Sequence, residues 1–149
     1  MKAVVMRVKS ASVTIGGKVN GAIGEGLLIL LGIAPNDTPA HCAKLCDKIL
    51  GLRIFHDDAG KMNCSLSDVG GSVLVVSQFT LYGDCHKGRR PNFLRAAAPD
   101  VAIPLYEQFL RECAERGFPP QHGEFGAAMQ VESVNDGPVT LIVDTDEIM

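Results

Sequence analysis

The sequence predicts a single α+β domain over residues 1–149, with a curved, mainly antiparallel sheet or open barrel and two main helices. Short strand-like runs separated by glycine turns dominate the chain, and two helical patterns interrupt them. This order is typical of a sheet that carries helices against one side. The length of 149 residues suits one domain with its own core.

Alternating or continuous apolar residues predict the strands of this sheet. Gly16-Gly17 lies between two such runs and predicts a two-residue hairpin. Leu27–Ala34 is apolar on both faces and predicts a central strand. Ser72–Tyr82 predicts a second central strand, in which Ser77 and Phe79 share one side and Gln78 and Thr80 the other. The predicted strands are residues 2–8, 12–15, 18–23, 27–34, 52–55, 72–82, 127–134 and 139–144.

Two amphipathic segments predict the helices. The first begins at Pro39, with Thr38 as its N-cap, and stops at Gly51. The second covers Asp100–Arg116, with Asp100 as its N-cap. Residues 83–99, ahead of the second helix, predict a long basic loop that contains proline.

Composition and charge restrict the function only broadly. The net charge of −3 excludes binding to polyanions by bulk charge, although Lys87-Gly88-Arg89-Arg90 forms a local basic cluster that suits phosphate contacts or is simply a solvated loop. No apolar run approaches the ~18 residues of a membrane span. Five cysteines without a cleavable signal pattern indicate reduced thiols, so we expect a cytoplasmic location.

Ser77-Gln78-Phe79-Thr80-Leu81 is the first segment with chemical potential. An ester hydrolase needs an attacking oxygen and donors for the oxyanion, and this segment offers hydroxyls, an amide and main-chain N–H groups at a strand end. No histidine or carboxylate neighbours Thr80 in the sequence to activate it. The alternative is that these are ordinary polar residues at the end of a strand.

Gly137-Pro138 is the second segment. An X-Pro bond adopts the cis form at modest cost, and glycine and proline together present carbonyl oxygens and bare main chain. The alternative is an ordinary hairpin turn, which the preceding Asp136 favours.

Taken together, the two segments resemble the motifs of the D-aminoacyl-tRNA deacylase family. The resemblance covers nearly the whole chain as one deacylase-like domain, 1–149, and both motifs are intact. The segments that carry it, in order, are Arg7 to Val13, Gly26–Leu28, Arg53–Phe55, Gly60–Asn63, Gly70–Leu81, Lys87–Pro91, Met129–Val131 and Asn135–Thr140.

The resemblance implies a homodimeric hydrolase for translation quality control that proofreads tRNA by removing D-amino acids and accepts glycine on the tRNA for alanine. Gly137-Pro138 is expected to be cis and to reach into the partner's site, where its carbonyls exclude L side chains. Ser77, Gln78, Phe79 and Thr80 are expected to line that site, and the 2′-hydroxyl of the terminal adenosine is expected to assist water. Thr80 is then a pocket residue, without an obligatory nucleophilic role.

The RNA partner is the acceptor end of tRNA, and we expect neither a cofactor nor a metal. The candidates for phosphate contacts are Arg7, Lys87, Arg89 and Arg90.

Other readings compete with this one. Cys42 and Cys46 with His41 have the spacing of a helical metal site, but both thiols lie on the apolar stripe, which favours core packing. Cys85-His86 has the residue types of a catalytic pair, although adjacent residues rarely reach the geometry. The rival functions are a nucleic-acid-binding module without catalysis and a relative with altered chirality or tRNA preference. No role can be given to His56 or His122.

Overall fold

The computed structural model describes residues 1–149 and has a curved sheet as its centre. The sheet runs in the order β2-β1-β3-β6-β7. Strand β8 lies outside this order and pairs with β1. Its strands are β1 (Lys2–Ile15), β2 (Lys18–Ile23), β3 (Gly26–Gly32), β6 (Ser72–Ser77), β7 (Gln121–His122) and β8 (Gln130–Asp144).

The sheet is nearly closed into a barrel, as the sequence predicted. Most pairs are antiparallel, but β6 runs parallel to both β3 and β7, so the sheet is mixed. Asn20 of β2 donates to the carbonyl of His122 in β7 at 2.7 Å, which brings the two ends of the sheet together. The predicted hairpin at Gly16-Gly17 is confirmed, since β1 and β2 pair on either side of it.

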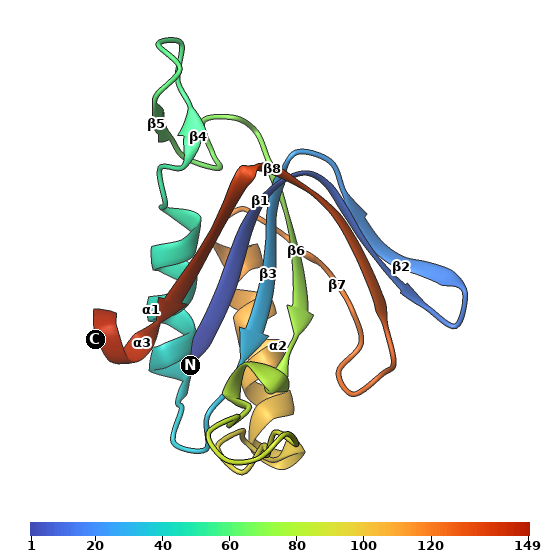
Figure 1. The fold of residues 1–149 in the computed structure, drawn as a ribbon. Coiled ribbons are helices and arrows are strands. Elements are labelled where there is room, and N and C mark those ends of the chain that lie inside the picture. The colour runs from blue at the N-terminus through green and yellow to red at the C-terminus, as the bar shows by residue number, and fades with distance from the viewer.

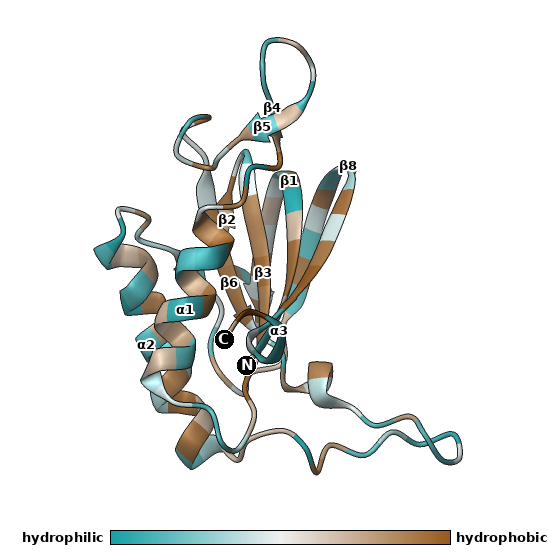
Figure 2. Cartoon of the chain, turned by 90° about the vertical axis from the view of Figure 1, so that its left-hand side faces the viewer, coloured by the Kyte–Doolittle hydropathy of each residue, from teal (hydrophilic) through white to brown (hydrophobic).

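Two helices, α1 (Pro39–Leu50) and α2 (Pro99–Glu115), lie on one side of the strands, and a short α3 (Thr145–Ile148) follows β8. Figure 2 shows strands that are largely apolar beside helices with mixed faces. The main core lies between sheet and helices and includes Phe109, Leu45 and Ile49, all fully buried. A smaller core inside the curve of the sheet contains Val8, Val13, Leu28, Leu74 and others.

Several element boundaries differ from the sequence predictions, and the predicted strands 2–8 and 12–15 form the single strand β1. The strand predicted over 72–82 ends at Ser77, and a 3-10 helix, η1 (Phe79–Tyr82), follows. Helix α2 begins at Pro99 with Ala98 as its N-cap, because proline's fixed φ suits the first helical position, so Asp100 lies in the first turn. The strand predicted over 52–55 is instead β4 (Phe55–His56), paired with β5 (Met62–Cys64).

The largest difference concerns the two predicted C-terminal strands. They form one strand, β8, because residues on both sides of Gly137-Pro138 pair antiparallel with the same strand β1. The chain therefore does not reverse there, and the hairpin-turn alternative for Gly137-Pro138 is wrong. The register shifts opposite Arg7, between the pairs Met6–Thr140 and Val8–Asn135, so residues 136–139 bulge from the strand.

None of the helices combines the length and the apolar character that crossing a membrane requires.

Candidate active site

The turn after β6 presents two unused main-chain donors. The N–H of Gln78 donates to the carbonyl of Leu31 at 2.7 Å, and the N–H of Leu81 donates to the carbonyl of Gln78 at 3.2 Å. The N–H groups of Phe79 and Thr80 donate to no acceptor in the chain, as is usual for the first N–H groups of a helical turn. The motif therefore offers two adjacent N–H groups to a ligand.

The polar side chains of this motif contact each other. Gln78 Nε2 donates to Thr80 Oγ1, so the Thr80 hydroxyl is held by an amide that cannot take its proton. The predicted separation of Ser77 and Phe79 from Gln78 and Thr80 on two sides of a strand is wrong, because η1 replaces the strand there. Phe79 is half exposed and packs edge-on against Phe93, with ring centroids 5.2 Å apart.

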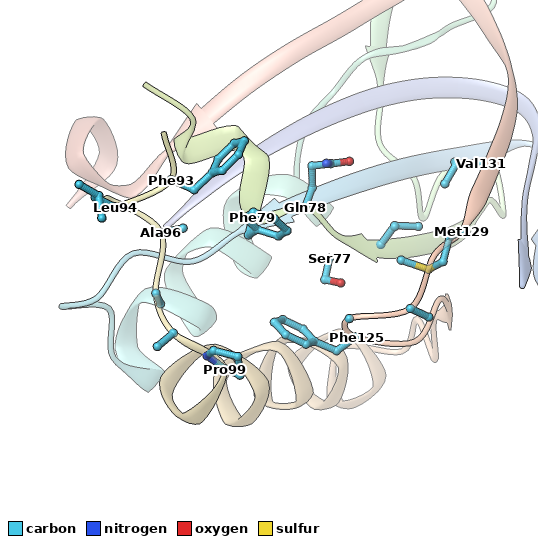
Figure 3. Close-up of a pocket in the computed structure, with 15 residues that line it drawn as sticks. Ser77, Gln78, Phe79, Phe93, Leu94, Ala96, Pro99, Phe125, Met129 and Val131 are labelled. Atoms are coloured by element: carbon cyan, nitrogen blue, oxygen red, sulfur yellow. The ribbon is translucent and has the colours of Figure 1, made fainter. Parts of the chain in front are cut away.

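A cavity of about 680 Å³ opens beside this turn (Figure 3). Its wall is mainly apolar and contains no acid, base, thiol or phenol side chain. Four segments build it: the end of β6 with Phe79, the loop before α2, the first residue of α2, and the segment that enters β8. The lining residues are Val76, Ser77, Gln78, Phe79, Phe93, Leu94, Ala96, Ala97, Ala98, Pro99, Phe125, Gly126, Ala127, Met129 and Val131.

Sequence reasoning located the turn of this cavity but missed its aromatic and sulfur-containing wall. Phe93, Phe125 and Met129 lie 12 or more residues from the motif. The one sequence signal for this wall was the apolar pair Phe93-Leu94 in an otherwise basic loop. In the structure Leu94 is 87% exposed.

The Gly137-Pro138 segment is fixed by two side chains. Asn135 Oδ1 accepts from the N–H of Val139 at 2.8 Å, and Asn135 Nδ2 donates to Thr140 Oγ1 at 2.7 Å. Arg7 Nε donates to the carbonyl of Asp136 at 2.8 Å. The Gly137-Pro138 bond is cis, as the resemblance implied. The bulge is therefore clamped at its base, and Asn135, which the sequence analysis named only as the start of the segment Asn135–Thr140, helps to hold it.

Arg7 does not fit the predicted role of a phosphate contact. It is only 3% exposed, and its guanidinium also donates to the carbonyl of Ile54 at 2.7 Å. An arginine whose donors serve buried carbonyls has little capacity left for RNA. Arg7 is buried because it lies in β1, opposite the register shift of β8.

The two motifs lie at opposite ends of the sheet. Arg7, beside the bulge, pairs with Leu27 of β3, whereas Ser77 pairs with Leu31. Four strand residues correspond to roughly 13 Å along β3. Figure 1 shows β8 bending at one end of the sheet and β6 running to the other, where η1 follows. Neither Gly137 nor Pro138 lines the cavity of its own chain.

The basic cluster lies on a loop attached to the cavity rim. Lys87, Arg89 and Arg90 are exposed. Main-chain hydrogen bonds of 2.7 and 3.0 Å between Asp84 and Asn92 close the loop at its base, immediately before the cavity residue Phe93.

The remaining candidates take no part in the cavity. Cys42 and Cys46 are fully buried in the core, and burial raises the pKa of the Cys42 thiol to about 12, so core packing is the correct reading. Cys85 is exposed, as is His86. His122 lies on β7, where its Nδ1 is 2.6 Å from the carbonyl of Gly123.

Comparison with known proteins connects this geometry to a family. A sequence model described as D-Tyr-tRNA(Tyr) deacylase matches residues 4–144. The chain belongs to this deacylase family. It is thus a member of a family of hydrolases, and the family and enzyme class predicted from the motifs are confirmed.

Individual relatives match nearly the whole chain. The D-aminoacyl-tRNA deacylase of Thermus aquaticus is 59% identical over 147 residues, 99% of this chain and 97% of that protein. The D-aminoacyl-tRNA deacylase of Desulfatibacillum aliphaticivorans is 59% identical over 145 residues, 97% of this chain and 99% of that protein. A solved structure named c-Myc DNA Unwinding Element Binding Protein has a TM-score of 0.91 and 44% identity, covering 97% of this chain and 98% of that one.

Proposed function

We propose that two copies of this chain form a D-aminoacyl-tRNA deacylase in which each site combines the cavity of one copy with Gly137-Pro138 of the other. The observation that carries the proposal is the separation of the two motifs. They lie at opposite ends of one sheet, and the Gly137-Pro138 bulge does not line its own cavity. If both motifs act on one substrate, they have to come from different copies.

A two-fold axis makes this arrangement self-consistent. In an isologous dimer the bulge of each copy meets the cavity of its partner, which gives two identical sites. Strand β8 supports such a contact, because Val134 and Ile142 are 54% and 69% exposed on a strand with one unpaired edge. Apolar side chains on an open strand edge are a common place for association.

The chemistry proposed is hydrolysis of the ester between the amino acid and the terminal ribose. Charge develops on the ester carbonyl oxygen in the transition state, and the free N–H groups of Phe79 and Thr80 suit an oxyanion. The cavity wall holds no side chain that can act as a base, so the proton has to be taken by another group. The 2′-hydroxyl of the terminal ribose is the group proposed to assist attack by water.

Chirality is set by exclusion. The partner's Gly137-Pro138 brings main chain against the α-carbon of the substrate, where an L side chain collides and the hydrogen of a D residue does not. Glycine carries no side chain and is accepted as well, so glycine attached to the tRNA for alanine is a second substrate. Clamping by Asn135 and Arg7 supports this role, because exclusion requires a bulge that does not yield.

The acceptor end of tRNA is the proposed partner. Lys87, Arg89 and Arg90 supply phosphate contacts at the rim, and the half-exposed ring of Phe79 offers a surface for base stacking. No cofactor takes part in the proposed reaction. Since charged tRNA is made and used in the cytoplasm, that location remains the expectation.

Turnover by purified protein tests the proposal. D-tyrosyl-tRNA, L-tyrosyl-tRNA and glycyl-tRNA for alanine are incubated at equal concentration, and release of the amino acid is followed. We expect rapid hydrolysis of the first and third and little of the second. The 44% identity to a protein named for binding a DNA element favours one rival, binding without catalysis. Retention of tRNA without any hydrolysis would establish that rival instead.

A further inference from the structure

Gly32 lies against the turn that carries the free donors. A Cβ atom at Gly32 would be 3.1 Å from Leu81 Cβ, 3.2 Å from the carbonyl oxygen of Gln78 and 3.3 Å from Tyr82 Cδ2. The carbonyl oxygen of Gln78 is a main-chain atom and Leu81 Cβ is bonded directly to the main chain, so neither atom can rotate away. Only a residue without a side chain lets η1 lie this close to β3.

The close approach also fixes the direction in which the N–H of Phe79 points. The N–H of Gln78 is anchored on the carbonyl of Leu31 at 2.7 Å, and the carbonyl of Gln78 then lies over Gly32. The Gln78–Phe79 peptide is trans, since the cis bond of the chain is at Gly137-Pro138. The C=O and N–H of a trans peptide point in opposite directions, so the N–H of Phe79 points away from β3.

From this geometry we propose that Gly32 is a positioning residue for the ester hydrolysis, an inference that rests on the proposed function above. Its missing side chain sets how close the 78–82 turn lies to β3, and thereby where the N–H groups of Phe79 and Thr80 meet the oxyanion. Donors act on an oxyanion within a narrow distance range, about 2.7–3.1 Å. A methyl group at position 32 displaces them by a few tenths of an ångström, enough to weaken these contacts in the transition state.

The test compares Gly32→Ala with Gly24→Ala. Position 24 is a matched control, since a Cβ there meets nothing within 4 Å and neither glycine has a left-handed backbone. We expect Gly32→Ala to lower kcat about tenfold with KM changed less than twofold, and Gly24→Ala to match wild type. The amide NMR signals of Phe79 and Thr80 should shift in Gly32→Ala, whereas that of Asp136 should not.

A wild-type kcat in folded Gly32→Ala, or a loss confined to KM, overturns the inference. If Gly32→Ala does not fold, Gly83→Ala decides, because a Cβ at Gly83 would lie 3.0 Å from both the carbonyl oxygen of Thr80 and Phe93 Cε1 and so press on the same turn. The same fall in kcat supports the inference, and an unchanged kcat overturns it. Absence of turnover by the wild type removes the proposed function, while the two amide shifts still report whether Gly32 positions the turn.

Discussion

Arg7 Nε donates to the main-chain carbonyl of Asp136 at 2.8 Å and so connects strand β1 with the residue that precedes Gly137. The same guanidinium donates to the carbonyl of Ile54, next to β4. One buried arginine thus holds two segments that are far apart in sequence, and its burial argues against the role in RNA binding that the sequence predicted for it.

Removing this clamp should loosen the bulge. Arg7→Ala leaves two carbonyls without their donors, which costs about 1–3 kcal/mol of stability for each buried group left unpaired. We expect a lower melting temperature and a smaller ratio of D- to L-aminoacyl-tRNA hydrolysis. Arg53→Ala is the control, because Arg53 also donates to a carbonyl, that of Asn63 at 2.8 Å, but is exposed. Loss of tRNA affinity in Arg7→Ala with stability and selectivity intact would restore the phosphate role.

Gly137 tolerates no side chain. Its φ of +142° is unfavourable for other residues, and a Cβ there would lie 2.9 Å from the nitrogen of Val139 and 3.1 Å from Arg7 Nη2. Gly137→Ala should reduce activity toward D-aminoacyl-tRNA, selectivity against the L form, or both. Gly60→Ala serves as control, since Gly60 also has a positive φ, +77°, but a Cβ there meets nothing within 4 Å. Equal rates and equal selectivity in the two variants would exclude Gly137 from the site.

The free N–H of Phe79 can be deleted alone. Phe79→Pro removes the donor and the ring, whereas Phe79→Ala removes only the ring. If the N–H stabilises the oxyanion, Phe79→Pro should lose about 10²–10³ in kcat relative to Phe79→Ala. Single-turnover rates at saturating enzyme measure this difference. Similar rates in the two folded variants would show that the oxyanion is bound elsewhere.

The basic loop should govern the salt dependence of tRNA binding. Replacing Arg89 and Arg90 together by alanine should reduce the slope of log affinity against log salt by about 2, if each contacts one phosphate. Lys44→Ala with Lys48→Ala is the matched control, because both lysines are exposed on α1. Binding titrations at several salt concentrations give the slopes. An unchanged slope in the arginine variant, or an equal change in the lysine variant, would remove the loop from the RNA surface.

Most of the fold could be predicted because the local signals agree with the tertiary contacts. The apolar stripe of Cys42, Leu45, Cys46 and Ile49 indicated a helix packed on the core, and all four residues are fully buried. Gly16-Gly17 indicated a hairpin because glycine suits its backbone.

The errors occur where long-range contacts override local preference. Phe79, Thr80 and Tyr82 favour strands, yet the chain curls into η1 after the N–H of Gln78 reaches Leu31. Asp136 before Gly137 suggested a turn, but pairing with β1 on both sides keeps β8 continuous. In each case the deciding partner belongs to a distant strand.

Only the main-chain motifs of the candidate site could be proposed from the sequence. Ser77–Thr80 and Gly137-Pro138 are short contiguous segments that can be read directly in the sequence. The burial of Arg7 depends on contacts 47 and 129 residues away, which no local pattern reports.

The most direct test of the central claim mixes two defective chains. A Phe79→Pro chain has a damaged cavity and an intact bulge, and a Gly137→Phe chain has an intact cavity and a bulge too large for its partner. If each site is shared between copies, half of randomly formed dimers are mixed and each holds one intact site. Co-expressed chains should then recover about a quarter of the wild-type rate on D-tyrosyl-tRNA, although each variant alone is inactive. Activity of the mixture no greater than that of the separate variants, with mixed dimers demonstrated, would contradict the shared site.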